Sequence, residues 1–105
     1  MKAIVCDAIA RRRRVSFTYL GRQRIVEPHL CGRNEAGHDL VLGYVVAGHS
    51  SSDPKPGWRN HLLSELRHIE LLEDGFEGPR FGFNPHDPRF IQVYCQVSTA
   101  RSTGT

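Results

Sequence analysis

The spacing of apolar residues at the start of the chain predicts a short helix. Ile4, Val5, Ala8 and Ile9 recur at three- and four-residue intervals, which places them on one stripe of an amphipathic helix. We expect this helix over residues 2–13, because the arginines at its C-terminal end lie where the helix dipole favours cations.

After the helix the pattern changes to a period of two, which is typical of a strand. Residues 15–20 alternate apolar and polar side chains, residues 21–22 suit a tight turn, and residues 23–27 continue as the partner strand. We expect Pro28 to end this hairpin, because proline has no backbone N–H to donate to a ladder.

Short apolar or alternating runs, separated by clusters of glycine, proline and polar residues, continue along the rest of the chain. They predict four more strands, over residues 39–47, 58–63, 68–72 and 90–97. Residues 48–57 and 78–89 have the composition of loops. We therefore expect one mainly β domain over residues 1–97, a small curled sheet or partly open barrel, followed by a disordered polar tail over residues 98–105.

The composition is that of an ordinary globular domain. Lys and Arg total 14 against 11 Asp and Glu, a net charge of +3, which is too small to dominate the long-range field. All basic residues except Lys2 and Lys55 are arginines, whose planar donors suit phosphates, carboxylates and flat rings. No apolar run approaches the roughly 20 residues that a membrane-spanning helix needs, and the arginines follow the first apolar stretch, the reverse of a secretory signal. We expect a cytoplasmic protein without membrane partners.

The three cysteines, Cys6, Cys31 and Cys95, are an odd number without a CxxC spacing. This pattern argues against a disulfide framework and against a compact zinc knuckle. Because each cysteine has apolar or strand-like neighbours in sequence, we expect inert buried thiols, with a reactive thiolate as the alternative.

The residues predict neither a metal centre nor an enzyme. None of the six histidines shows an HxH, HxxxH or HExxH spacing, although distant residues can still converge on a metal. His49, residues 50–52 and Asp53 include the residue types of a hydrolytic triad, but they lack a GxSxG elbow and lie on a predicted loop without rigid support. We expect no catalysis, no cofactor and no metal.

The segment of residues 11–28, here called the arginine-flanked hairpin, is the strongest candidate for a binding surface. Its four consecutive arginines form either a solvated helix end or a phosphate-contacting patch, and they cannot all face one way because a helix turns ~100° per residue. Tyr19, Arg22 and Arg24 follow on the hairpin, and a ring beside arginines is the pairing that stacks bases and holds phosphates. Tyr19 suits the core equally well.

Five blocks along the chain resemble, in order and spacing, the WYL domain family. These blocks are AIARRRRVSFTY at residues 8–19, RIVEP at 24–28, LVLGY at 40–44, WR at 58–59 and LRHIELL at 66–72. The resemblance as a whole covers most of the domain, from about residue 4 to residue 76.

Domains of that family are Sm-like, SH3-type β-barrels that usually follow a DNA-binding helix-turn-helix in bacterial transcription regulators. Their proposed role is to sense a ligand, with nucleotides or single-stranded nucleic acid favoured. The resemblance therefore implies an SH3/Sm-like, partly open β-barrel with an N-terminal helix, serving as a ligand-sensing module of transcriptional control. Its candidate protein partners are a second copy of the chain or a separate DNA-binding protein. The candidate ligand-binding residues are Arg14, Tyr19, Arg24, Arg59 and His61.

The chain departs from the family pattern in the second half of the expected pocket. The positions of the Trp-Tyr-Leu triplet hold DLV at residues 39–41, and the later family stretch Arg-x-Phe-Arg-Leu-Asp-Arg-Ile reads RNHLLSEL at residues 59–66. His61 thus takes the place of a phenylalanine, and two arginines are lost. Arg59 either holds an anion or pairs with a glutamate on the surface.

These losses add weight to an alternative function, a protein-interaction or assembly module without a small ligand. Sm-like barrels associate readily through strand edges, and the apolar residues 41–46 or 81–83 are the segments expected to dock a partner or a second copy.

Overall fold

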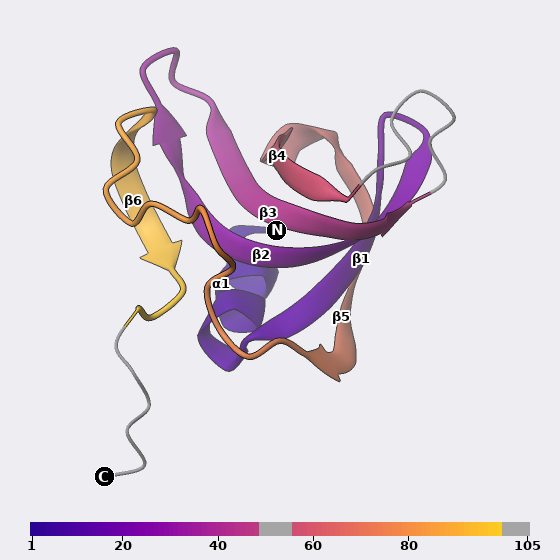
Figure 1. The fold of residues 1–105 in the computed structure, drawn as a ribbon. Coiled ribbons are helices and arrows are strands. Elements are labelled where there is room, and N and C mark those ends of the chain that lie inside the picture. Colours follow the sequence, from indigo (N-terminus) through magenta and orange to yellow (C-terminus); the bar gives the residue numbers. More distant parts are fainter. Residues whose placement is uncertain (49–55, 100–105) are drawn as a thin grey trace, which may run out of the picture.

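The computed structural model describes residues 1–48 and 56–99 and shows a mainly β domain with one N-terminal helix (Figure 1). The elements are α1 (Lys2–Arg11), β1 (Arg13–Tyr19), β2 (Arg22–Asn34), β3 (Asp39–Gly48), β4 (Gly57–Leu62), the 3₁₀ turn η1 (Leu63–Glu65), β5 (Leu66–Gly75) and β6 (Phe90–Gln96). The part of the predicted loop at residues 49–55 and the part of the predicted tail at residues 100–105 lie outside the described residues. No helix in the described ranges is long and apolar enough to cross a membrane.

The strands form one antiparallel sheet in the order β4-β3-β2-β1-β5, and β6 pairs with β2. Strand β3 follows one edge of β2, whereas β1 and β6 share its other edge, β1 along the first part and β6 along the last. The described residues of β4 and β5, at the two ends of the path, form no ladder with each other. The sheet is therefore a partly open barrel of SH3-like character, which confirms the predicted fold class.

Strand β2 is longer than the sequence predicts, because Pro28 does not end it. The register of β2 against β3 shifts between the Pro28–Gly43 pair and the Leu30–Leu42 pair, leaving His29 as an extra residue. A bulge is the place where a strand interior accepts proline and changes direction. The prediction that the hairpin ends at Pro28 is therefore wrong, and the bulge lets one strand serve both β1 and β6.

Left-handed backbone marks both ends of β1. Arg12 closes α1 with φ 53°, so the helix ends two residues earlier than predicted and β1 starts at once. Leu20 and Gly21, with φ of 51° and 79°, make the two-residue turn to β2, a geometry that matches the twist of the flanking strands. Leu20 carries no turn signal, which explains why the predicted turn is one residue too late.

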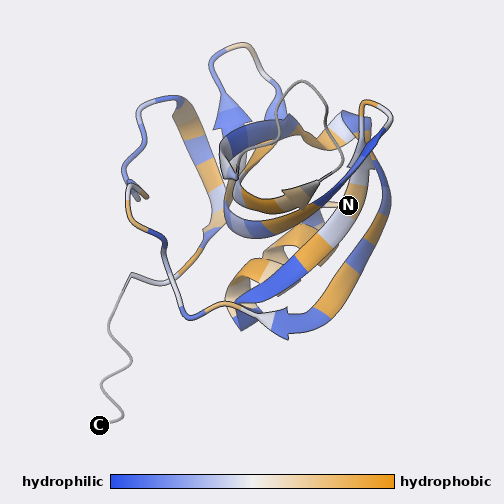
Figure 2. Cartoon of the chain, turned by 45° about the vertical axis from the view of Figure 1, so that its right-hand side comes forward, coloured by the Kyte–Doolittle hydropathy of each residue, from blue (hydrophilic) through white to orange (hydrophobic). Residues whose placement is uncertain are grey.

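The core lies between α1 and the curved sheet, where hydrophobic and hydrophilic bands alternate along the strands (Figure 2). Its buried members come from nearly every element: Val5, Ala8, Ile9, Val15, Phe17, Val26, Cys31, Val41, Leu63, Leu66 and Val97. A second cluster of Leu30, Leu40, Leu42 and Phe90 packs with Trp58 and Phe83. The strands that carry the candidate site are thus stabilised by the apolar area that is buried in these two clusters.

Gly32 allows β6 to lie close to β2. A Cβ at Gly32 would overlap the carbonyl oxygen of Gln92 and lie 3.0 Å from Cδ1 of Phe90. We predict that Gly32→Ala lowers the free energy of unfolding by about 1–3 kcal/mol, because overpacking against backbone cannot be relieved by a rotamer change. Urea denaturation followed by circular dichroism measures this loss.

The matched control is Gly57→Ala, whose Cβ would meet, among the described residues, only the Arg59 guanidinium, at 3.6 Å. That variant is expected to stay within about 0.5 kcal/mol of the wild type. Equal stability of Gly32→Ala and the wild type would contradict the close approach of β6 to β2.

Candidate functional site

Three of the five predicted ligand-binding residues touch one another directly, and a fourth lies on the same face of the sheet. A nitrogen of the Arg24 guanidinium lies 3.2 Å from Nε2 of His61, and the ring centroids of Tyr19 and His61 are 4.9 Å apart. Arg59 precedes His61 by two residues on β4, which puts both side chains on one face. We call Tyr19, Arg24, Arg59 and His61 the mouth cluster; Arg14 lies outside it.

His61 is fully buried and uncharged. Its ring packs edge-on against Phe17 and Tyr19, and its Nδ1 lies 3.4 Å from the Val41 carbonyl oxygen. Because a carbonyl only accepts, Nδ1 carries the proton, and Nε2 is left to accept from Arg24. Burial, reinforced by the nearby arginine charges, lowers the pKa of His61 to about 4. The ring is therefore neutral at pH 7.

Arg24 is positioned by neutral groups. Besides its hydrogen bond to His61, its guanidinium lies over the Tyr19 ring, 5.5 Å from the centroid. Within residues 1–48 and 56–99 no carboxylate lies within 4 Å of Arg24. The half-buried side chain is therefore held in place while its positive charge is not cancelled by any described acidic group.

Tyr19 and Arg59 complete the mouth cluster from opposite strands. The Tyr19 hydroxyl accepts a hydrogen bond from the Leu62 N–H at 3.1 Å, and its half-buried ring also packs against the core. The Arg59 guanidinium donates to the Trp58 carbonyl oxygen at 2.7 Å, and its charge contributes to the low pKa of His61. Tyr19 thus packs against the core and also belongs to the mouth cluster.

Arg14 belongs to a separate ion network centred on the buried carboxylate of Glu27. Arg14 and Arg80 both donate to it, at 3.0 Å from Nη2 and 2.6 Å from Nε respectively. Burial by itself would raise the pKa of Glu27, but the hydrogen bonds and charges of Arg80 and Arg14 outweigh it and lower the pKa below its usual value. Glu27 is therefore ionised at neutral pH, and its negative charge is paired with the positive charges of Arg14 and Arg80.

His29 links this network to an aromatic cluster. Its Nδ1 lies 2.8 Å from the Glu27 carbonyl oxygen, and its Nε2 accepts the Arg80 backbone N–H at 3.1 Å. The ring contacts Trp58 and stacks on Phe76, and burial lowers the pKa of His29. Sequence reasoning missed both His29 and Arg80. A glutamate inside an otherwise apolar run was the available signal for Glu27, but Arg80 lies 53 residues away in an irregular segment.

The four consecutive arginines bind four different parts of the molecule. Arg11 pairs with Asp7 at 2.9 Å, and Arg12 donates to the carbonyl oxygens of Glu77 and Ser98. Arg13 donates to the Leu72 carbonyl oxygen at 2.6 Å, while Arg14 binds Glu27. Arg12, Arg13 and Arg14 thus tie the helix end and β1 to other segments, whereas Arg11 pairs within α1, and the four side chains do not share one face.

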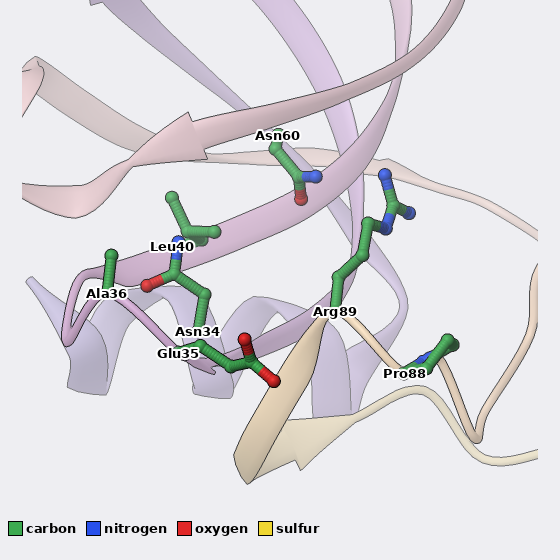
Figure 3. Close-up of a pocket in the computed structure, with 7 residues that line it drawn as sticks. All are labelled: Asn34, Glu35, Ala36, Leu40, Asn60, Pro88 and Arg89. Carbon is green, nitrogen blue, oxygen red and sulfur yellow. The ribbon is translucent and has the colours of Figure 1, made fainter.

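Two shallow hollows lie away from the mouth cluster, near Pro88 and Arg89. The first, of about 470 Å³, is lined by Asn34, Glu35, Ala36, Leu40, Asn60, Pro88 and Arg89 (Figure 3). The second, of about 390 Å³, lies beside Trp58 and Phe83. Arg89 is already paired with Asp87 at 2.6 Å, and Glu35 adds a negative charge to the first hollow. These hollows therefore suit an anion less well than the mouth cluster does.

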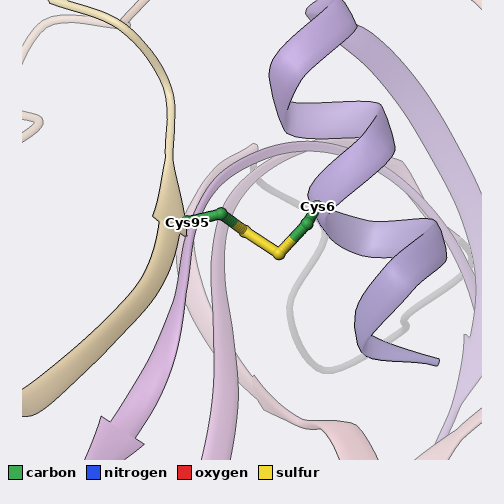
Figure 4. The surroundings of a disulfide bond; sticks show 2 residues. All are labelled: Cys6 and Cys95. Atoms are coloured by element: carbon green, nitrogen blue, oxygen red, sulfur yellow. A yellow bond between two sulfur atoms is a disulfide. The ribbon is translucent and has the colours of Figure 1, made fainter.

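Cys6 and Cys95 are joined by a disulfide, with their Cα atoms 5.8 Å apart (Figure 4), whereas Cys31 is a free, buried thiol. The expectation of three inert thiols is therefore wrong for Cys6 and Cys95. Their 89-residue separation is closed by the packing of α1 near β6, which no local spacing indicates. Burial raises the pKa of Cys31 to about 11, so this residue is protonated at neutral pH.

The neutral state of His61 predicts a specific dependence of stability on pH. Because the folded pKa, about 4, lies below the unfolded value of about 6.5, the unfolded chain binds the proton first. The contribution of neutral His61 to the free energy of unfolding is therefore complete above pH 6.5 and is lost as the pH falls toward 4. We expect His61→Phe, which keeps a ring between Phe17 and Tyr19, to lose less stability than the wild type over this window.

Urea denaturation at several pH values measures the difference between the two proteins. The control is His38→Gln at an exposed position, which should follow the wild-type profile. Parallel profiles for His61→Phe and the wild type between pH 6.5 and 4 would contradict a buried neutral His61.

Comparison of the chain with family models, curated proteins and solved structures gives no match. The resemblance to the WYL family therefore stays a prediction from the residues, and the function is argued below from the geometry of the mouth cluster.

Proposed function

We propose that this domain is a regulatory sensing module that binds a nucleotide or a single-stranded nucleic acid through the mouth cluster. The observation that carries the proposal is the hydrogen bond between Arg24 and neutral His61. It fixes a guanidinium beside an aromatic ring without cancelling its charge, which is the state in which an arginine recognises a phosphate.

The location of Arg24 strengthens its attraction for an anion. A half-buried charge acts through a lower effective dielectric than an exposed one, so a phosphate gains more there than at the exposed Arg11. Arg59 adds a second positive charge on the same side, and the half-buried Tyr19 ring beside Arg24 is the aromatic group proposed to contact a base. These groups match the phosphate and the base of a nucleotide.

The regulatory context of the proposal comes from the WYL resemblance. That resemblance implies a role in bacterial transcriptional control. Within the proposal, Arg14 supports the site indirectly, because its bond to Glu27 fixes the start of β1.

The first test compares two single-charge variants in a binding assay. Fluorescence anisotropy with short single-stranded oligonucleotides and competition by nucleotides measure the affinity at low salt. We expect Arg24→Ala to weaken binding about tenfold, the scale of one lost stacking or phosphate contact. Arg11→Ala, which removes the same charge from a position paired with Asp7, should bind like the wild type.

The salt dependence provides a second readout of the same experiment. The logarithm of the wild-type association constant should fall linearly with the logarithm of the salt concentration, with a slope of about −0.7 per phosphate engaged. Arg24→Ala should show a shallower slope. The proposal fails if no oligonucleotide or nucleotide binds at low salt, or if Arg11→Ala is as damaging as Arg24→Ala.

The alternative function, an assembly module, is favoured by the exposed apolar side chains near β6. Ile91 and Val93 are 61% and 41% exposed and Phe81 is fully exposed, and among the described strands β6 pairs only with β2. Residues 41–46 do not offer the strand edge that the sequence suggested, because β3 is paired with β2 and β4 on its two sides. Light scattering at high protein concentration separates the candidates, since a monomer contradicts self-assembly.

A further inference from the structure

We propose that the reduced domain binds one Cu⁺ ion through the sulfur atoms of Cys6, Cys31 and Cys95. These three atoms all lie within 4.8 Å of one another, although only Cys6 and Cys95 are joined. The site lies between α1, β2 and β6, apart from the mouth cluster, and the proposal is independent of the function argued above.

Three rigid elements bring the sulfur atoms together. Cys31 on β2 and Cys95 on β6 are direct partners in the antiparallel ladder, and such partners point to the same face with Cβ atoms roughly 4.5–5.5 Å apart. Cys6 reaches the pair from α1 (Figure 4), whose Val5 and Ile9 are anchored in the core. Ligands held by packed elements are pre-organised for a metal.

The spacing fits three thiolates around one ion. With metal–sulfur bonds of about 2.3 Å, three sulfurs in a trigonal arrangement lie about 4 Å apart. Opening the bond between Cys6 and Cys95 lets their side chains rotate to that separation, while Cys31 already lies within 4.8 Å of both. The half-buried Cys6 and Cys95 provide the entry path to the fully buried Cys31.

The donor set favours Cu⁺ over Zn²⁺. Thiolates select soft ions of both kinds, but structural zinc sites are almost always four-coordinate. In the described part of the chain, no histidine, aspartate or glutamate joins the three cysteines. Three sulfurs without a fourth protein ligand match an ion that three thiolates satisfy.

The binding step follows reduction of the disulfide by a dithiol. The dithiol loses two protons and two electrons and becomes a cyclic disulfide, and Cys6 and Cys95 each become a thiol. Cu⁺ then displaces one proton from each of the three thiols, forming three sulfur–copper bonds and releasing three protons. The oxidised protein retains only Cys31, so reduction acts as the gate for metal binding.

The test is an anaerobic titration of the full chain with Cu⁺ against the chromophoric chelator bicinchoninate, after the dithiol has been removed. We expect one Cu⁺ per reduced chain, with a thiolate-to-copper charge-transfer absorption and an increase in Tm. The oxidised wild type serves as the matched control and should take up no copper. If the reduced protein unfolds, refolding on addition of Cu⁺ reports the same binding.

Cys31→Ser isolates the third ligand, because it retains Cys6 and Cys95 and the disulfide that tests its folding. It should bind Cu⁺ more than about 100-fold more weakly, since even changes behind a metal ligand cost 10- to 100-fold. The proposal is overturned if the reduced wild type takes up no copper, or if Cys31→Ser binds as tightly as the wild type. A preference of the reduced protein for Zn²⁺ over Cu⁺ would also overturn it.

Discussion

The buried carboxylate of Glu27 is the constraint on which the rest of the domain depends. At 1% exposure a carboxylate must be paired and hydrogen-bonded, because an isolated buried charge is too costly. Arg14, at the start of β1, forms an ion pair with this carboxylate. Arg80, in the segment between β5 and β6, forms a second one. One ion network therefore fixes the start of β1, the bulge of β2 and the aromatic cluster around His29. An apolar replacement can match such a network in stability, so its main contribution is to determine where these segments lie.

The same principle separates structural arginines from the candidate binding arginine. Arg11 and Arg14 meet carboxylates, and Arg12 and Arg13 meet carbonyl oxygens of distant segments. Arg24 instead donates to a neutral imidazole. Its guanidinium is therefore held in place, and no described carboxylate neutralises its positive charge. The arginine-flanked hairpin thus has two parts. Arg12, Arg13 and Arg14 bind other segments of the fold, whereas Tyr19 at the end of β1 and Arg24 on β2 belong to the mouth cluster, the site proposed to bind a phosphate.

Local periodicity was sufficient to predict the helix, most of the strands and the barrel class, because burial on one face repeats within a few residues. The sequence also predicted Tyr19, Arg24 and His61 as site residues, and the structure places them in contact. The remaining features depend on contacts between distant segments. Glu27 and Arg80 lie 53 residues apart, and Cys6 and Cys95 lie 89 apart, so no spacing rule links them. The sequence predicts a strand end at Pro28, because the bulge that accepts this proline appears only in the pairing of β2 with β3.

The central claim is that an anion binds to the mouth cluster and not to the four consecutive arginines at residues 11–14. Side-chain Nε–H signals of arginines, followed by NMR during titration with a short single-stranded oligonucleotide, test this directly, because each arginine reports separately. The account predicts that the signals of Arg24 and Arg59 shift with saturation while those of Arg14 and Arg80, bound to Glu27, stay in place. Shifts at Arg14 and Arg80, with Arg24 unchanged, would contradict it.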